Sequence, residues 1–211
     1  MVCVLLLGGM LAPAEIIDRI AVSVGDSVIT TSDLDREIRV NAFLSGAQPD
    51  FSPAARRAAA ERMVEQQLIR RELEVSKYPL PAPSAADFEL QRFRASNYKS
   101  DPEFQQALSA YGVTEQQVKD QLLWQLTLLR FVEVRFRPGV QVSDQEIQDY
   151  FEKVVKPAAQ KAHPGAPVAL EDYRSQVEQT LIGQRTDQDI DAWLKQARTR
   201  TEIVFHEEAF R

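Results

Sequence analysis

Residues 17–34 read IDRIAVSVGDSVITTSDL, and this stretch decides the fold. Its first part continues an Ile- and Val-rich, strand-like run that begins at Ile16 and reaches Val24. Gly25-Asp26-Ser27 is a turn signal, and Val28-Ile29-Thr30 resumes the extended pattern. The stretch therefore predicts a short β-hairpin.

The same stretch then changes to a helical pattern. Ser32 is a good N-cap residue, and Asp33 and Asp35 place negative charge in a first helical turn, where the helix dipole favours it. The apolar residues that follow at helical spacing mark the buried face of a short helix: Leu34, Ile38, Phe43 and Leu44.

Helix signals recur along the rest of the chain. Ser52-Pro53 opens a helix that runs to about Lys77, and three prolines in residues 79–83 end it. Capping-box patterns predict three further helix starts, at Ser84 with Asp87, Thr114 with Gln117, and Ser143 with Glu146. The helix from Thr114 to about Pro138 is apolar on most sides, which is typical of a central core helix.

Three more elements complete the expected order. Asp101-Pro102 opens a short helix that Tyr111-Gly112 closes, and a last helix runs from about Leu170 to Arg198. Residues 200–207 read as a terminal strand. Since two strands are unstable alone in water, we expect this strand to pair with the hairpin in one small sheet, within a mainly α fold.

The first fourteen residues read as a secretory signal peptide. Met1 to Ala14 carry no charged side chain, and Ala12-Pro13-Ala14 supplies the small-x-small pattern of a cleavage site. A buried first strand or helix is the alternative. Cys3 is the one cysteine of the sequence, so a chain that starts at about Glu15 has none, which suits an oxidising compartment such as the periplasm.

Composition narrows the class of partner. The chain has 211 residues, 44% of them hydrophobic, and a net charge of −6. An acidic chain of ordinary hydrophobicity argues against nucleic acid and against docking on anionic lipid. We expect a soluble protein with no stable membrane insertion after removal of the leader.

Patterns of catalysis are absent from the sequence. Neither His163 nor His206 has a partner at the spacing of a helix-borne metal pair, and no phosphate-binding loop or nucleophile elbow occurs. We therefore expect no catalytic residue, no metal site and no cofactor.

Aromatic residues between the first helix and the apolar helix are the candidate binding residues. Such residues are usually core, but seven in one segment of short helices exceed what those helices can cover, so an apolar groove for extended polypeptide is a second interpretation. The seven candidates are Phe43, Phe51, Phe88, Phe93, Tyr98, Phe104 and Tyr111.

Residues 17–34 resemble the opening of the SurA-type periplasmic chaperones. Residues 63–69 (MVEQQLI) are similar to the second helix of that family, and residues 111–137 followed by VSDQEI at 142–147 are similar to its later helices. The resemblance to the SurA N-terminal domain family covers most of residues 17–153 and resumes more loosely in the last helix and strand.

This resemblance implies a helical peptide-binding module with three parts: a signal peptide at 1–14, a chaperone region at 15–161, and a C-terminal helix and strand at 170–211 that pack back on it. Family members usually carry parvulin-type prolyl isomerase domains before the final helix, whereas this chain has only the loop at 161–169. Isomerase activity is therefore not carried over.

The sequence thus favours an ATP-independent periplasmic chaperone for unfolded or outer-membrane polypeptides. Two alternatives remain open. One is a prolyl isomerase with a degenerate or absent catalytic domain, and the other is an assembly protein with one dedicated partner.

Overall fold

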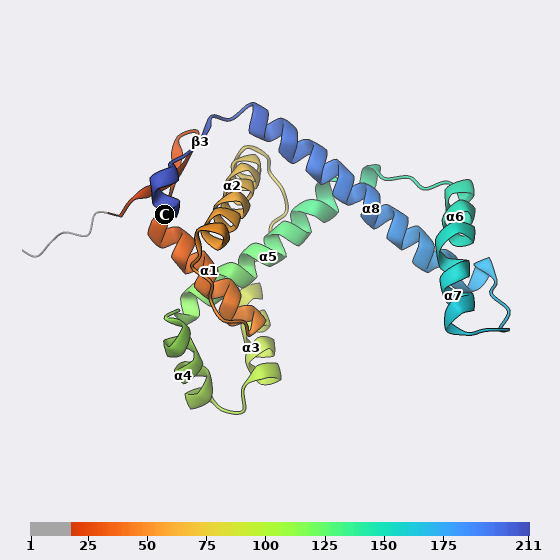
Figure 1. The fold of residues 1–211 in the computed structure, drawn as a ribbon, viewed down its shortest axis with the longest axis horizontal. Helices are drawn as coiled ribbons and strands as arrows, with labels where there is room; N and C mark the ends of the chain where they lie inside the picture. Colours follow the sequence, from red (N-terminus) through yellow and green to blue (C-terminus); the bar gives the residue numbers. More distant parts are fainter. Residues whose placement is uncertain (1–17) are drawn as a thin grey trace, which may run out of the picture.

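The computed structural model describes residues 18–211, and the predicted leader at 1–14 lies outside them. The chain forms β1 (Ile20–Val24), β2 (Ser27–Thr30), α1 (Thr31–Ser45), α2 (Pro53–Val75), α3 (Ala85–Asn97), α4 (Asp101–Tyr111), α5 (Glu115–Arg135), η1 (Arg137–Gly139), α6 (Asp144–Tyr150), the π-helical turn η2 (Phe151–Val155), α7 (Lys156–Ala162), α8 (Leu170–Thr199), β3 (Ile203–Phe205) and η3 (Glu207–Phe210). Figure 1 shows a body built from β1 to α5, from which α8 reaches out to α6 and α7.

A three-stranded antiparallel sheet joins the two ends of the described chain. Its order is β2-β1-β3, with Val22 opposite Phe205 and Val24 opposite Ile203. This confirms the predicted mainly α fold with a small sheet made by the hairpin and the C-terminal strand. The strands are shorter than predicted: β1 begins at Ile20, and β3 ends at Phe205 because the chain turns into η3.

The sheet lies on the first of three hydrophobic clusters in the body. Strand residues such as Val22 and Ile29 pack with Val64 and Leu68 of α2, the end of α8, and Phe210 of η3. A second cluster joins α1, α3, α4 and the start of α5, and a third joins α2, the end of α5 and α8. The body is therefore held by contacts between segments far apart in sequence.

Helix starts agree with the predicted capping boxes in two of three cases. Thr114 with Gln117 and Ser143 with Glu146 form both reciprocal hydrogen bonds. The predicted helix start at Ser84 is confirmed, since α3 begins at Ala85, but the predicted capping box is wrong, because the Ser84 backbone is already helical and the amide of Asp87 donates to the Ser84 carbonyl. The prediction of Ser32 as N-cap is also wrong, because α1 begins two residues earlier with Thr30 as its cap.

Helix α5 is less central than its sequence predicts. Val118, Trp124 and Phe131 are buried, but Leu129 is 63% exposed. The helix packs on α3 and α1 near its start and joins the third cluster near its end. One flank of its middle therefore stays open to solvent.

Helix α6 and the turn η2 pack against the first half of α8 and, together with α7, form an arm. Ile147 and Phe151 pack on Val177 in a fourth hydrophobic cluster, separate from those of the body. The middle of α8 carries Gly183 and the buried Thr186, whose hydroxyl donates to the carbonyl of Ile182 at 2.8 Å. Only residues 163–169 join α7 to α8.

The hairpin turn provides a stability test. Gly25 has φ of +58°, and an added Cβ would lie 3.0 Å from Nη1 of Arg71. Gly25→Ala should therefore lower the free energy of unfolding by about 1 kcal/mol, measured by urea denaturation.

Gly183→Ala is the matched control, because this glycine lies within α8 and an added Cβ would meet nothing within 4 Å. It should raise the free energy of unfolding by about 0.5–1 kcal/mol. Equal effects of the two substitutions would contradict the assignment of Gly25 to a turn that requires positive φ.

Candidate functional site

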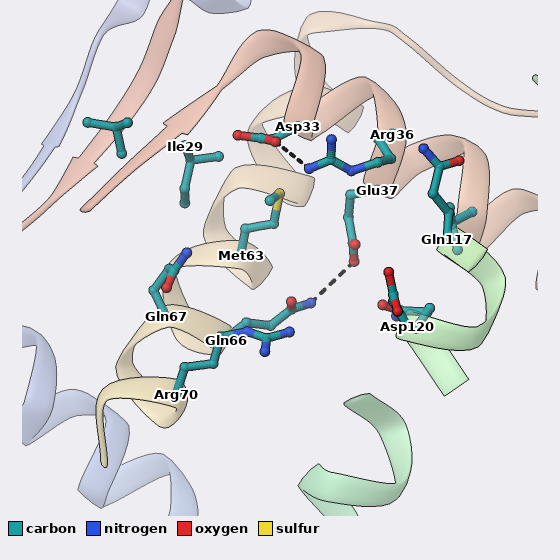
Figure 2. A pocket seen from close by; sticks show the side chains of 13 residues that line it. Ile29, Asp33, Arg36, Glu37, Met63, Gln66, Gln67, Arg70, Gln117 and Asp120 are labelled. Atoms are coloured by element: carbon teal, nitrogen blue, oxygen red, sulfur yellow. Dashed lines mark hydrogen bonds and ion pairs between the residues drawn. The ribbon is translucent and has the colours of Figure 1, made fainter. Parts of the chain in front are cut away.

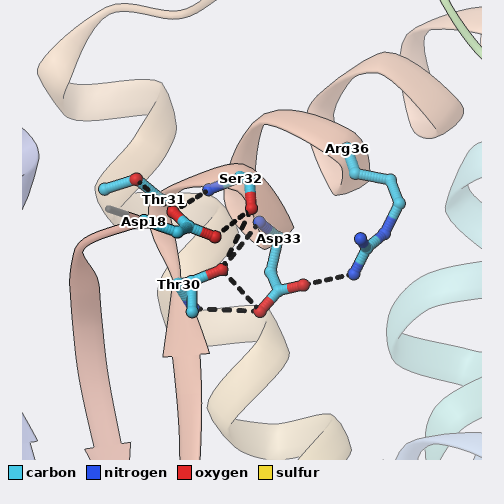
Figure 3. Close-up of polar contacts among 6 residues, drawn as sticks. All are labelled: Asp18, Thr30, Thr31, Ser32, Asp33 and Arg36. Atoms are coloured by element: carbon cyan, nitrogen blue, oxygen red, sulfur yellow. Dashed lines mark hydrogen bonds and ion pairs between the residues drawn. The ribbon is translucent and has the colours of Figure 1, made fainter. Parts of the chain in front are cut away.

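The N-terminus of α1 is held by a capping box that also shapes the site. The Thr30 hydroxyl accepts from the amide of Asp33 at 3.3 Å, and the amide of Thr30 donates to Oδ2 of Asp33 at 3.0 Å. The other oxygen of Asp33 pairs with Arg36 one turn along the helix (Figure 3). The cap therefore holds the Asp33 carboxylate beside Arg36 at one face of α1.

Asp18, which precedes β1, forms hydrogen bonds to the first turn of α1. Its carboxylate accepts from the Thr31 hydroxyl at 2.9 Å, from the Ser32 amide at 3.2 Å and from the Ser32 hydroxyl (Figure 3). Hydrogen bonds, above all from the Ser32 side chain, hold the pKa of Asp18 well below its usual range. The start of α1 is thus tied to both strands of the hairpin.

A polar cavity of about 350 Å³ opens between β2, α1, α2 and α5. Figure 2 shows Asp33, Arg36 and Glu37 of α1 facing Gln66, Gln67 and Arg70 of α2, with Gln117 and Asp120 of α5 on the remaining side. Val28, Ile29, Val40, Met63 and Gln121 complete the lining. Four glutamine amides therefore surround a floor that is partly apolar.

A second, more apolar cavity of about 630 Å³ adjoins the first. Arg70 and Asp120 line both cavities. The walls of the second are Leu73 and Glu74 of α2, Leu80 of the proline-rich linker, and Leu123, Trp124 and Thr127 of α5. We call the two cavities together the α1–α2–α5 groove, and its two parts the polar cavity and the Trp124 cavity.

Arg70 stands at the junction of the two cavities. Its guanidinium lies 4.2 Å above the ring of Trp124, and no ion pair of residues 18–211 includes it. Desolvation lowers the pKa of Arg70, while Glu37, Glu74 and Asp120 act in the opposite direction. The groove therefore presents a stacked cation among carboxylates and neutral amides.

Five of the seven aromatic candidates form one cluster, which is distinct from the groove. The ring of Phe43 lies 5.5–6.1 Å from those of Phe93, Tyr98, Phe104 and Tyr111. Phe43 and Phe104 are buried, and the other three are partly buried against the same core. We call these five residues the aromatic cluster; it joins α1, α3 and α4.

The other two candidates lie apart from the aromatic cluster. Phe51 packs against the first hydrophobic cluster, with the guanidinium groups of Arg39 and Arg56 at 5.4 and 5.9 Å from its ring centre. Phe88 of α3 is 64% exposed. The structure therefore brings five candidates together in a core and leaves Phe88 on the surface.

His206 makes a hydrogen-bonding contact within the sheet. His206 lies 3.1 Å from the Ser23 hydroxyl, a contact that ties the end of β3 to β1. Residues 18–211 contain no group of three or more His, Cys, Asp or Glu side chains placed to hold a metal ion. None of the helices in this range has the length and apolar character needed to cross a membrane.

The groove residues were missed by the sequence analysis. Gln117 and Gln121 lie one turn apart on the same face of α5, and Gln66 and Gln67 precede Arg70 on α2. Amides on the inward faces of α2 and α5 were the available signal. Their convergence depends on how α1, α2 and α5 are spaced, which no local pattern contains.

Two phenylalanines of opposite exposure test the assignment of the aromatic cluster to the core. Phe104→Ala should lower the free energy of unfolding by about 3–5 kcal/mol, because a fully buried ring is removed. Phe88→Ala is the matched control and should change it by less than about 0.5 kcal/mol. Urea denaturation followed by circular dichroism measures both, and similar losses would contradict the assignment.

Asp18 gives a pH-dependent prediction. Because folding lowers the pKa of its carboxyl, its contribution to stability is present above the unfolded value of about 3.9 and is lost as pH falls below it. The stability difference between the wild type and Asp18→Asn should therefore shrink between about pH 5 and pH 3. Urea denaturation across this range measures the difference, and a constant value would contradict the hydrogen-bonding assignment.

Comparison with known proteins gives one distant relative. No family model matches the chain. The chaperone SurA of Hahella chejuensis (strain KCTC 2396) is 28% identical over 153 residues, which are 69% of this chain and 35% of that protein. The chain therefore spans about a third of the length of the curated relative it matches, and its similarity to SurA is distant but extends over most of its own length.

Proposed function

We propose that this chain is an ATP-independent chaperone that holds unfolded polypeptides in the α1–α2–α5 groove. The observation that carries the proposal is the pairing of an amide-lined cavity with an apolar one in a single open groove. An unfolded chain presents the same two chemistries, a polar backbone and apolar side chains.

The polar cavity suits the backbone of a client. A glutamine amide has both a donor group and an acceptor oxygen, so it can pair with either a peptide carbonyl or a peptide N–H. The side-chain N–H groups of Gln66 and Gln121 already donate to Glu37 and Asn41. Their carbonyl oxygens can therefore accept from the peptide N–H of a client. Because these amides would pair with the client backbone, which is the same in every sequence, they support binding of many different clients.

The Trp124 cavity suits an apolar side chain of the same client. Leu73, Leu80 and Leu123 surround one face of it, and Leu80 is 50% exposed. Covering such surface releases about 25 cal/mol for each Å² removed from water, which gives binding without a nucleotide. Contacts of this size are individually weak, so a client can leave for a downstream acceptor.

Six of the seven aromatic candidates enter this proposal in two roles, and the seventh, Phe51, packs against the first hydrophobic cluster. Phe43 and Phe104 are buried, and with Phe93, Tyr98 and Tyr111 they hold α1, α3 and α4 together. Direct contact with clients falls to Phe88, whose ring is exposed. A client-binding role for the other members stays a prediction.

We further propose that the protein acts in the periplasm on outer-membrane polypeptides and has no isomerase activity. The leader-like residues 1–14 and the distant similarity to SurA support the location and the clients. The direct connection of α7 to α8 through 163–169 supports a holding function without catalysis. Uncatalysed isomerisation of a proline-containing peptide in the presence of the protein is the expected result.

Suppression of aggregation tests the proposal. The purified protein in stoichiometric excess should reduce light scattering when a urea-denatured outer-membrane porin is diluted into buffer. Leu80→Ser should weaken client binding about fivefold, because it removes about 1 kcal/mol of apolar contact in the Trp124 cavity. Fluorescence anisotropy of a labelled client measures the affinity.

Val154→Ser is the matched control. Val154 is 48% exposed, close to the exposure of Leu80, but it lies in η2 on the arm. Its affinity for the client should stay within twofold of the wild type. Equal losses of client affinity in both variants, or no suppression of aggregation by a folded wild-type sample, would contradict the proposal. Recovery of one stoichiometric protein from periplasm in a pull-down would instead favour a dedicated partner.

A further inference from the structure

Strand β2 is an edge strand whose outer side carries free backbone groups. The turn at Gly25-Asp26 pairs Val24 with Ser27, so the next pair, Ser23 with Val28, is a position without hydrogen bonds between the two strands. The amide of His206 donates to the carbonyl of Ala21, which shows that the backbone N–H and C=O groups of odd-numbered residues in β1 point toward β3. The N–H and C=O of Val28 therefore point away from the sheet.

Neither group finds a partner elsewhere in the described residues. No turn, loop or side-chain hydrogen bond within 18–211 uses the backbone of Val28, and its side chain is 50% exposed. Proteins usually protect an edge with charge, proline or a bulge. Residues 27–30 include none of these, and the irregular pairing of the hairpin lies at Ile20 and Val22 of β1.

The free edge opens into the groove rather than onto a flat surface. Val28 and Ile29 form one wall of the polar cavity, and Figure 2 shows Ile29 beside Met63 and Gln67. A smaller cavity of about 120 Å³ continues along Asp26 and Ser27 against α2. Gln67 lines both cavities, and no hydrogen bond of the described residues uses its side chain.

We propose that an extended segment of the client adds to the sheet as a fourth strand. One residue of the client pairs with the backbone N–H and C=O of Val28, and the neighbouring peptide group of the client pairs with the side-chain amide of Gln67. The inference rests on the proposed function and specifies how the groove holds its client. Backbone pairing is independent of client sequence, as a general holder requires. Alternate side chains of the added strand would face the apolar floor at Ile29 and Met63.

The occupant is a single extended strand and not a second copy of this chain. The edge lies between α1, α2 and α5 in a cavity of about 350 Å³. A second folded copy would bring its own helices with its β2, and these walls leave no place for them. An unfolded segment brings only one strand.

Amide hydrogen exchange at Val28 tests the pairing directly. The full chain, labelled with ¹⁵N, is saturated with a soluble peptide of about ten residues copied from one porin strand. At about 90% occupancy, exchange of the Val28 amide should slow about tenfold, because it proceeds only from the free fraction. The amide of Phe205, on the outer side of β3, is the internal control and should be unchanged.

Two substitutions at Val28 give an independent readout. Val28→Pro removes the outward N–H but no hydrogen bond to β1, whereas Val28→Ala keeps the N–H and removes most of the side chain. Client affinity should fall about fivefold more for Val28→Pro than for Val28→Ala. Circular dichroism and thermal unfolding establish that each variant is folded, and the exchange experiment does not depend on either variant.

The possible failures are distinguishable. A wild type that binds the peptide without slowing Val28 exchange overturns strand addition and leaves the proposed function intact. A folded wild type that neither binds the peptide nor suppresses aggregation overturns both. If, without peptide, the Val28 amide exchanges more slowly as the protein concentration is raised, the occupant is a second copy of the chain. That result also overturns the inference.

Discussion

Pairing of β1 with β3 is the constraint on which the rest of the structure depends. β1 is the middle strand, and without β3 the hairpin would be a two-stranded ribbon, which is marginal in water. The pairing joins Val22 to Phe205, 183 positions later in the chain, and it brings the end of α8 onto α2. Every helix from α1 to α7 lies inside this closure.

The closure also explains why a groove can stay open in a small body. Hydrophobic clusters hold α5 against α3 near its start and against α2 and α8 from Trp124 onward. On another side of its first half, Gln117, Asp120 and Gln121 face α1 and α2 across the polar cavity. Amides and charged groups line this cavity where a core would carry apolar side chains, and this lining supports the proposed client site.

The sequence predicted interactions between residues close together in the chain better than interactions between distant helices. Capping boxes at Thr114 and Ser143 were predicted because each is a contact over three residues. The capping box at Ser84 failed because its backbone is in the α region, where its side chain makes no cap hydrogen bond. The pairing of the chain ends followed from the instability of an isolated hairpin, and the burial of Phe43 followed from its spacing on α1. The groove was not predicted, because it depends on how α1, α2 and α5 are spaced, which local patterns do not contain.

Helix α8 has a mechanical consequence. About 20 residues, or roughly 30 Å at 1.5 Å per residue, separate Leu170 on the arm from Ile190 in the body. Between them lie two features at which helices commonly bend, Gly183 and the Thr186 hydroxyl bonded to the Ile182 carbonyl. Leu170 is roughly 20 Å along the helix from Gly183, so a bend of about 10° at Gly183 would move the arm by roughly 3 Å relative to the body.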